Sequence, residues 1–353
     1  MTHAVPIAAE PPLVDPGQRK AWLIGGGGIG SLSAAAFMIR DGGMTGANIT
    51  ILEALPLLGG SLDGAGDPEG GYSLRGGRML TSDNYECTWD LFKTIPSPTR
   101  PVASVYEETM EFNAVFKANS MARLVDRRRA KVPVSSMGFS MQDRLELLKL
   151  TNASEATLGA DCITDWLSPS FFETEFWYMW VTTFAFQPWH SAVEFKRYLH
   201  RFMLEFSRIE TLAGVKRTVF NQYDSLVMPL VSWLRGHGVN FVTGCTVTDL
   251  DHSATGVFSA TAIRCQRVGK AEVIAVGTDD LVVVQNGSMT DASSLGSMSR
   301  AGQENQGGQR QLDAVGEAGA GPPGFWQPGT VQLLHRAIGL AILYRHPEEP
   351  GVL

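Results

Sequence analysis

Glycines follow the first apolar run of the chain at a spacing that can hold a dinucleotide. Gly25 ends the run Ala21–Gly25, and Gly27, Gly28 and Gly30 follow it before a segment with helical apolar spacing. Where such glycines join a strand to a helix, their amide groups can cradle a pyrophosphate at the positive end of the helix.

The next apolar run, Ile49–Glu53, ends in a carboxylate. Glu53 can accept hydrogen bonds from an adenosine ribose, and it would repel the 2′-phosphate of NADP. Together with Ser31–Arg40 as the helix, the pattern of strand, glycine loop, helix, strand and acid predicts an FAD or NAD site rather than an ordinary glycine turn.

Two further glycine-rich segments favour FAD over NAD. They read Leu58-Gly59-Gly60-Ser61 and Arg75-Gly76-Gly77-Arg78. A flavin needs backbone and arginine contacts beyond the first βαβ unit, and we assign those contacts to Gly60, Ser61, Arg75, Gly77 and Arg78. The alternative is a pair of solvent-exposed glycine turns.

A tyrosine lies in the segment of the chain that is richest in aromatic residues. Phe176–Phe206 reads as a helix, a break at Pro188 and a second helix, and Tyr198 falls in the second helix. A phenol is a weak acid, but it could donate a proton if cations lowered its pKa, and Lys196, Arg197 and His200 are its neighbours in the sequence. The alternative is a core tyrosine whose hydroxyl finds a partner.

Composition excludes several classes of function. The 353 residues are 44% apolar and carry a formal net charge of −7, which argues against a nucleic-acid partner held by bulk electrostatics. The four cysteines form no C-x-x-C pair, so we expect reduced thiols and no metal site. The amino terminus does not resemble a signal peptide, and no stretch approaches the ~20 apolar residues of a spanning helix. We therefore expect a cytoplasmic protein with at most peripheral membrane contact.

The order of predicted elements indicates an α/β fold in which a Rossmann-type FAD-binding domain carries an inserted, mostly helical substrate domain. The β pattern returns late in the chain, at Asn240–Thr243 and Asp280–Gln285. We divide the chain into a flexible start at 1–17, FAD-binding segments at 18–104 and 211–300, a helical insertion at 105–210, and a tail at 301–353.

Taken together, these segments resemble the oleate hydratases, the FAD-dependent fatty acid hydratases also called myosin-cross-reactive antigens. The resemblance runs through Ala21–Ser31, Ile51–Gly64, Gly70–Ser97, Phe176–Phe202, Val215–Val227 and Leu281–Ser294. It implies addition of water to a cis double bond of an unsaturated fatty acid such as oleate, giving a hydroxy fatty acid. It also implies that FAD has a structural or electrostatic role without net redox chemistry.

The resemblance assigns roles to three positions. Tyr198 matches the tyrosine that protonates the alkene, and Gln222 matches a residue that helps to hold the fatty acid carboxylate. Met79 stands where the family usually has a glutamate that positions or activates water, and a thioether cannot accept a proton at neutral pH. Thr81, Ser82 or Asp83 could hold the water instead.

The resemblance also implies structural roles for Phe184–His190, with the aromatic residues as the wall of a cavity and His190 as a hydrogen-bonded residue.

The resemblance stops near Ala301, and the chain is shorter than its relatives. Suitable codons for Gln311–Gly319, read one nucleotide out of register, spell Ser-Trp-Thr-Leu-Trp-Glu-Lys-Leu-Ala, which is a typical family segment. We therefore expect a frameshift near Ala301–Gln303, an early stop, and a poorly packed tail despite the helical periodicity of Val331–Arg345. A hydratase truncated in this way is expected to have impaired activity.

Two other functions stay open at this point. A flavin oxidoreductase of the amine oxidase or desaturase type would share the nucleotide fingerprint. A fragment that binds FAD or lipid without turnover would share it as well.

Overall fold

The computed structural model describes residues 15, 17–62, 64–67, 69, 71–74, 78–121, 124–134, 137–253, 259–285, 299 and 340–343. They fall into two compact units, of which one contains the described residues up to 74 and from 222 onward, and the other contains Arg78–Asn221.

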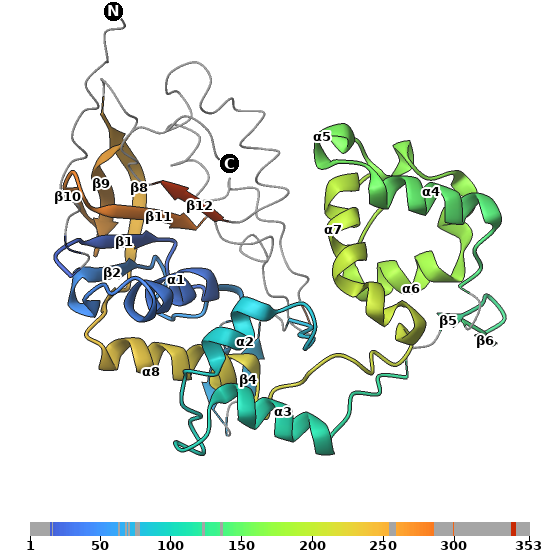
Figure 1. The fold of residues 1–353 in the computed structure, drawn as a ribbon, viewed down its shortest axis with the longest axis horizontal. Coiled ribbons are helices and arrows are strands. Elements are labelled where there is room, and N and C mark those ends of the chain that lie inside the picture. The colour runs from blue at the N-terminus through green and yellow to red at the C-terminus, as the bar shows by residue number, and fades with distance from the viewer. Residues whose placement is uncertain are drawn as a thin grey trace, which may run out of the picture. The chain divides into compact units, whose positions relative to one another are not determined.

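The first unit is a Rossmann-type α/β domain built on a five-stranded sheet in the order β12-β11-β1-β2-β7 (Figure 1). Its central strand β1 (Ala21–Ile24) pairs in parallel with both β2 (Ile49–Leu52) and β11 (Leu281–Gln285). β7 (Asn240–Val242) continues the parallel order beyond β2, whereas β12 (Leu340–Leu343) is antiparallel to β11. The fold class predicted from the sequence is confirmed.

The parallel strands form this sheet because they are almost continuously apolar, as strands covered on both faces must be. Helix α1 (Ile29–Arg40) packs against β1, β11 and helix α8 (Met228–Gly236). Small buried side chains at Ala35 and Ala36 let α1 approach its neighbours closely. A short π-helical segment, Tyr223–Val227, leads into α8.

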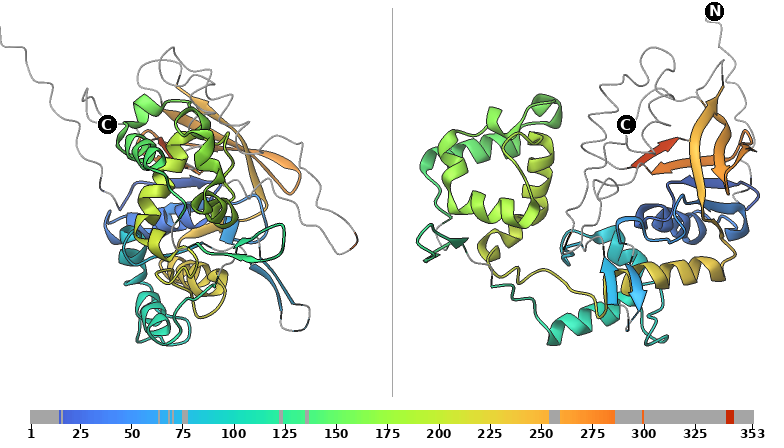
Figure 2. Two further views of the ribbon diagram at one scale, coloured as in Figure 1. Left: turned by 90° about the vertical axis from the view of Figure 1, so that its right-hand side faces the viewer. Right: turned by 180° about the vertical axis from the view of Figure 1, so that it is seen from behind.

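A second sheet in this unit was not predicted. It is antiparallel and consists of β8 (Cys245–His252), β9 (Ala260–Arg267) and β10 (Lys270–Ala275). Buried residues of β8 and β9 share one core cluster with residues of β1, β2 and β11, so the two sheets lie against each other (Figure 2). A separate hairpin joins β3 (Gly64–Asp67) to β4 (Gly71–Leu74).

The two cysteines of this second sheet yield a prediction. Cys245 and Cys265 are each 2% exposed, whereas Cys87 is exposed. Burial, with a hydrogen bond to the neighbouring Cys265, raises the pKa of Cys245 to about 12. Because the thiolate is the reactive form, we expect a thiol reagent at pH 8 to label Cys87 in the folded protein and Cys245 only after unfolding. Peptide mass spectrometry would measure this, and equal labelling rates for the two would contradict it.

The second unit is mostly helical. Its helices are α2 (Glu86–Phe92), α3 (Val105–Val115), α4 (Met141–Asn152), α5 (Glu155–Leu158), α6 (Glu175–Phe184) and α7 (Ala192–Phe202), with a small hairpin of β5 (Leu124–Val125) and β6 (Lys131–Val132). The predicted helix, break and helix around Pro188 are confirmed as α6 and α7. Ala185, in the left-handed conformation at φ +57°, ends α6.

The core of this unit is one group of buried side chains, which we call the aromatic cluster. It consists of Leu150, Ile163, Leu167, Phe171, Phe176, Trp177, Met179, Trp180, Phe186, Phe195, Leu199, Phe202 and Ile209. The rings pack edge to face and tilted, with Trp180 5.5 Å from Phe195 and 6.1 Å from Phe186 between centroids. Phe186 therefore belongs to a packed core, where the sequence analysis expected a cavity wall.

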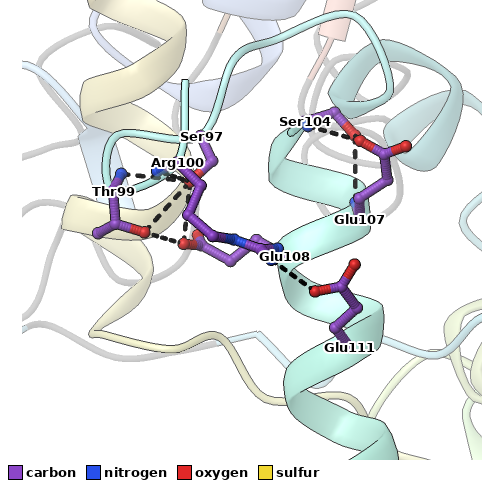
Figure 3. A network of polar contacts seen from close by, with 7 residues as sticks. All are labelled: Ser97, Thr99, Arg100, Ser104, Glu107, Glu108 and Glu111. Carbon is purple, nitrogen blue, oxygen red and sulfur yellow. Dashed lines mark hydrogen bonds and ion pairs between the residues drawn. The ribbon is translucent and has the colours of Figure 1, made fainter. Parts of the chain in front are cut away.

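Polar contacts extend the helical unit toward the start of the chain, as Figure 3 shows. The carboxylate of Glu108, buried in α3, accepts hydrogen bonds from the Ser97 hydroxyl at 2.9 Å and from Thr99. Ser104 and Glu107 form a capping box at the start of α3. The segment before Val105, expected to belong to the FAD-binding domain, therefore lies in the helical unit, whose boundaries are Arg78 and Asn221.

Most of the predicted tail, 301–353, lies outside the described residues. Within Val331–Arg345, where periodicity predicts a helix, Leu340–Leu343 is the strand β12. Across the described ranges, no helix combines the length and apolar character that crossing a membrane requires.

Candidate functional site

The glycine loop is held between two parallel strands. Gly25 follows β1 with a φ of +71°, which favours glycine, and the Gly26 amide donates to the Leu52 carbonyl oxygen at 3.0 Å. A Cβ on Gly26 would lie 2.5 Å from a methyl carbon of Ile51 and 2.8 Å from the Leu23 carbonyl oxygen. The loop therefore requires a glycine at this position on steric grounds alone.

Glu53, which the sequence analysis assigns to a ribose, lies against the glycine loop. Its carboxylate is 6% exposed and accepts hydrogen bonds from the Gly27 amide at 2.6 Å and the Leu55 amide at 2.8 Å. A Cβ on Gly27 would lie 2.3 Å from Glu53 Oε2. The acid is thus fixed next to the amides that could hold a dinucleotide.

The second glycine segment folds back onto the first. The Gly59 amide donates to the Gly27 carbonyl oxygen at 2.5 Å, and Gly28 and Gly59 form a parallel bridge. Gly60 has a φ of +55°, and a Cβ on it would lie 2.9 Å from the Gly28 Cα. The structure therefore brings Gly27, Gly28 and Gly60 together, with Ser61 next in the chain.

Two of the predicted cofactor contacts, Arg75 and Gly77, lie outside the described residues. Arg78 is exposed and begins the helical unit.

Sequence reasoning missed Gln285, which closes the loop from the far side. Its amide oxygen accepts hydrogen bonds from the Ser31 amide at 3.0 Å and the Ser31 hydroxyl at 2.8 Å. A Cβ on Gly28 or Gly30 would lie 2.9 Å or 3.1 Å from Gln285 Nε2. The only sequence signal was its place at the carboxyl end of a strand, where α/β folds place their ligand contacts.

These features fit a dinucleotide. Helix α1 begins at Ile29, and its N-cap residue Gly28 provides no side-chain cap. The glycines before its first turn stand where side chains would clash. Backbone amides at a helix N-terminus attract a pyrophosphate, and a buried carboxylate suits a ribose.

The helical unit carries the other predicted residues. Met79 and Tyr198 are partly buried, and both pack against the aromatic cluster. The Tyr198 ring lies 5.7 Å from Phe184 and 5.2 Å from Phe186 between centroids, both edge to face. The structure thus places the predicted proton donor and the methionine against one apolar core.

The cations that the sequence suggested for Tyr198 form contacts with other groups. Lys196 hydrogen bonds to the Ala153 carbonyl oxygen, Arg197 forms an ion pair with Glu155 at 2.5 Å, and His200 lies 3.2 Å from the Thr151 carbonyl oxygen. The guanidinium that lies over the Tyr198 ring belongs to Arg201, with its carbon 5.9 Å from the ring centroid.

A buried hydroxyl lies two residues beyond Met79. Thr81 is 3% exposed, and within the described residues its Oγ1 has no hydrogen-bond partner. Ser82 and Asp83, the other two candidates from the sequence, are exposed. Leu80, between Met79 and Thr81 in the chain, pairs with Lys216 in an antiparallel bridge.

The remaining predicted residues lie elsewhere. Gln222 belongs to the first unit, where it is half-buried just before the π-helical segment. His190 has structural contacts, since its Nδ1 accepts a hydrogen bond from the Gln187 amide at 3.3 Å. The described residues contain no group of His, Cys, Asp and Glu side chains that could hold a metal ion.

Comparison with known proteins identifies relatives over most of the chain. An oleate hydratase from Streptococcus pyogenes serotype M49 is 38% identical over 281 residues, which is 79% of this chain and 47% of that protein. A linoleate hydratase from Lactiplantibacillus plantarum is 33% identical over 317 residues, covering 82% of this chain and 54% of that protein. The chain therefore spans about half the length of the curated relatives it matches.

Solved structures show weaker similarity. An oxidoreductase from Methanosarcina mazei superposes with a TM-score of 0.47 at 14% identity, covering 76% of this chain and 59% of that one. A fatty acid isomerase from P. acnes superposes with a TM-score of 0.43 at 15% identity, covering 77% of this chain and 59% of that one.

The family comparison covers both compact units. The family model of MCRA matches residues 18–314, which continues past the expected change of frame at Ala301–Gln303. The chain belongs to the MCRA family.

Proposed function

We propose that this chain is the FAD-binding and alkene-binding part of a fatty acid hydratase, which adds water to a cis double bond of an unsaturated fatty acid such as oleate. The observation that carries the proposal is the position of Tyr198, whose phenol lies on an apolar aromatic core beneath a guanidinium. Relatives named oleate hydratase and linoleate hydratase support it.

FAD is the dinucleotide we assign to the glycine loop. Gly25, Gly27, Gly28 and Gly30 would form the loop around its pyrophosphate, with backbone amides other than that of Gly27 as donors, because the Gly27 amide donates to Glu53. Glu53 would accept hydrogen bonds from its ribose. Bound FAD would contribute structure and electrostatics rather than electrons, because addition of water to an alkene involves no net redox change.

Other residues of the chain would donate the proton, exclude water and bind the substrate carboxylate. Tyr198 would donate its hydroxyl proton to one alkene carbon, and the aromatic cluster would exclude bulk water from the resulting cation. The amide group of Gln222 would donate a hydrogen bond to the fatty acid carboxylate.

Thr81 would hold the reacting water. A buried hydroxyl without a protein partner is costly, and an ordered water normally satisfies it. Ser82 and Asp83 are exposed, so bulk solvent can satisfy their hydrogen bonds. Met79 has no acid or base function, so we assign positioning of the water to Thr81 Oγ1.

The assay is incubation of the purified protein with FAD and oleate, followed by mass spectrometry of the products. The proposal expects a hydroxystearate that carries one oxygen from H₂¹⁸O, without consumption of oxygen or an electron acceptor. Product formation that requires an acceptor would support a flavin oxidoreductase. Retention of FAD without any product would support a non-catalytic fragment.

Replacement of Thr81 by valine separates its function from its packing. Valine has the same shape, so we expect the free energy of unfolding to change by less than about 1 kcal/mol. Loss of the water contact should lower kcat by about 10²-fold, while Thr81→Ser retains most of it.

The matched control is Thr151→Val, because the Thr151 hydroxyl is satisfied by the Leu147 carbonyl oxygen at 2.7 Å. Unchanged kcat in Thr81→Val would remove Thr81 from the reaction.

A further inference from the structure

Arg201 joins two phenols that are far apart in the sequence. It lies in the last turn of α7, and its guanidinium carbon is 5.8 Å from the centroid of the Tyr85 ring and 5.9 Å from that of Tyr198. The side chain of Asn84 also hydrogen bonds to the Arg201 carbonyl oxygen. The segment before α2 is therefore fastened to the end of α7 by both backbone and side-chain contacts.

Tyr85 is itself fixed in place. It is half-buried, and its hydroxyl donates to the Met79 carbonyl oxygen at 2.9 Å. Burial raises the pKa of Tyr85, the positive charge of Arg201 opposes that rise, and the nearby Tyr198 phenol adds to it. The two phenols are close enough to affect each other electrostatically.

We propose that Tyr85 and Arg201 are positioning residues for Tyr198 and form with it one unit, the Tyr85–Arg201–Tyr198 cluster. This inference rests on the hydratase function proposed above. Tyr85, anchored on the Met79 carbonyl, holds the guanidinium, and the guanidinium holds the Tyr198 ring and supplies a fixed positive charge beside it.

The positive charge of Arg201 would act in both steps of the reaction. When the Tyr198 O–H bond breaks, its proton forms a C–H bond with one alkene carbon and its electron pair stays on the phenolate oxygen, which the cation stabilises. The water oxygen then bonds to the other carbon, and the surplus proton of that oxygen returns to the phenolate. Atoms and charges balance, so no separate carboxylate base is required, which suits a chain with Met79 in the wall of the site.

The kinetic test replaces the two positioning residues singly and together. We expect Arg201→Met to lower kcat by about 10²-fold with KM nearly unchanged, and Arg201→Lys to recover much of the loss. Tyr85→Phe should lower kcat by about tenfold. The kcat of the double variant should be no lower than that of Arg201→Met, because Tyr85 acts through Arg201. The control is Arg235→Met, since Arg235 lies 5.5 Å from the Phe241 ring in the other unit.

A second measurement does not depend on turnover. In the protein labelled with [¹³Cζ]tyrosine, the Tyr85 resonance should titrate at higher pH in Arg201→Met and at lower pH in Tyr198→Phe, because the cation favours the Tyr85 phenolate and the second phenol disfavours it. The proposal would be overturned if the losses of kcat in Tyr85→Phe and Arg201→Met were additive in the double variant. It would also be overturned if neither Arg201→Met nor Tyr198→Phe changed the pH at which Tyr85 titrates. Absence of hydration in the unaltered protein, with the titration shifts present, would count against the hydratase function and leave the cluster standing.

Discussion

Replacement of Tyr198 by phenylalanine should lower kcat for hydration by about 10³-fold while FAD binding and folding stay intact. Phenylalanine keeps the ring that packs edge to face against Phe184 and Phe186, so the aromatic cluster loses no volume. Only the O–H group that we propose as the proton source is removed. Steady-state formation of hydroxystearate, alongside FAD absorbance and thermal unfolding, measures the three quantities together.

Tyr178→Phe is the matched control. Tyr178 is 42% exposed on the neighbouring helix α6, and its hydroxyl donates to Glu173 at 2.8 Å. This change should leave kcat within about twofold, as surface changes away from a site usually do. If Tyr198→Phe kept a rate close to that of the unaltered protein, the proton would have to come from another group.

Replacement of Gly27 by alanine should weaken FAD binding and destabilise the fold. The added Cβ would lie 2.3 Å from Glu53 Oε2, so either the carboxylate or the loop must move. The hydrogen bond from the Gly27 amide to Glu53 would break, and overpacking of this kind costs about 2 kcal/mol of unfolding free energy. FAD affinity should fall by more than about tenfold, because the displaced amides and acid are the groups that we assign to binding it.

Isothermal titration with FAD and urea unfolding would measure these two effects. The control is Gly236→Ala at the end of α8, where a Cβ meets nothing within 4 Å and the change should be neutral or stabilising. Full FAD affinity in Gly27→Ala would contradict the assignment of the loop.

Local patterns were sufficient to predict the first βαβ unit. β1, α1 and β2 lie within a residue or two of the predicted ranges, because apolar runs, helical spacing and the intervening glycines are all encoded in neighbouring residues. The place of Glu53 at the end of β2 followed from the same pattern, whereas its contact with Gly27 did not. The second sheet, β8 to β10, escaped prediction because its strands alternate buried and exposed positions irregularly around two register shifts.

Contacts between segments far apart in the sequence could not be predicted from local patterns. The sequence places Lys196, Arg197 and His200 next to Tyr198, but a helix directs neighbours to different faces, and Arg201 comes three residues later onto the same side. Tyr85 and Gln285 reach their sites only through tertiary contacts. The sequence analysis placed residues up to 104 in the FAD-binding domain, whereas hydrogen bonds from Ser97 and Thr99 to Glu108 make that segment part of the helical unit.

The place of β11 beside β1 has a consequence for the synthesis of this protein. The central strand leaves the ribosome early, yet one of its two neighbours is encoded some 260 residues later, as the pairing of Ala21 with Leu281 records. Until then β1 has an open edge, and Gln285 is not yet there to support the glycine loop. The helical unit is encoded in between, so cofactor loading is expected to follow the synthesis of β11.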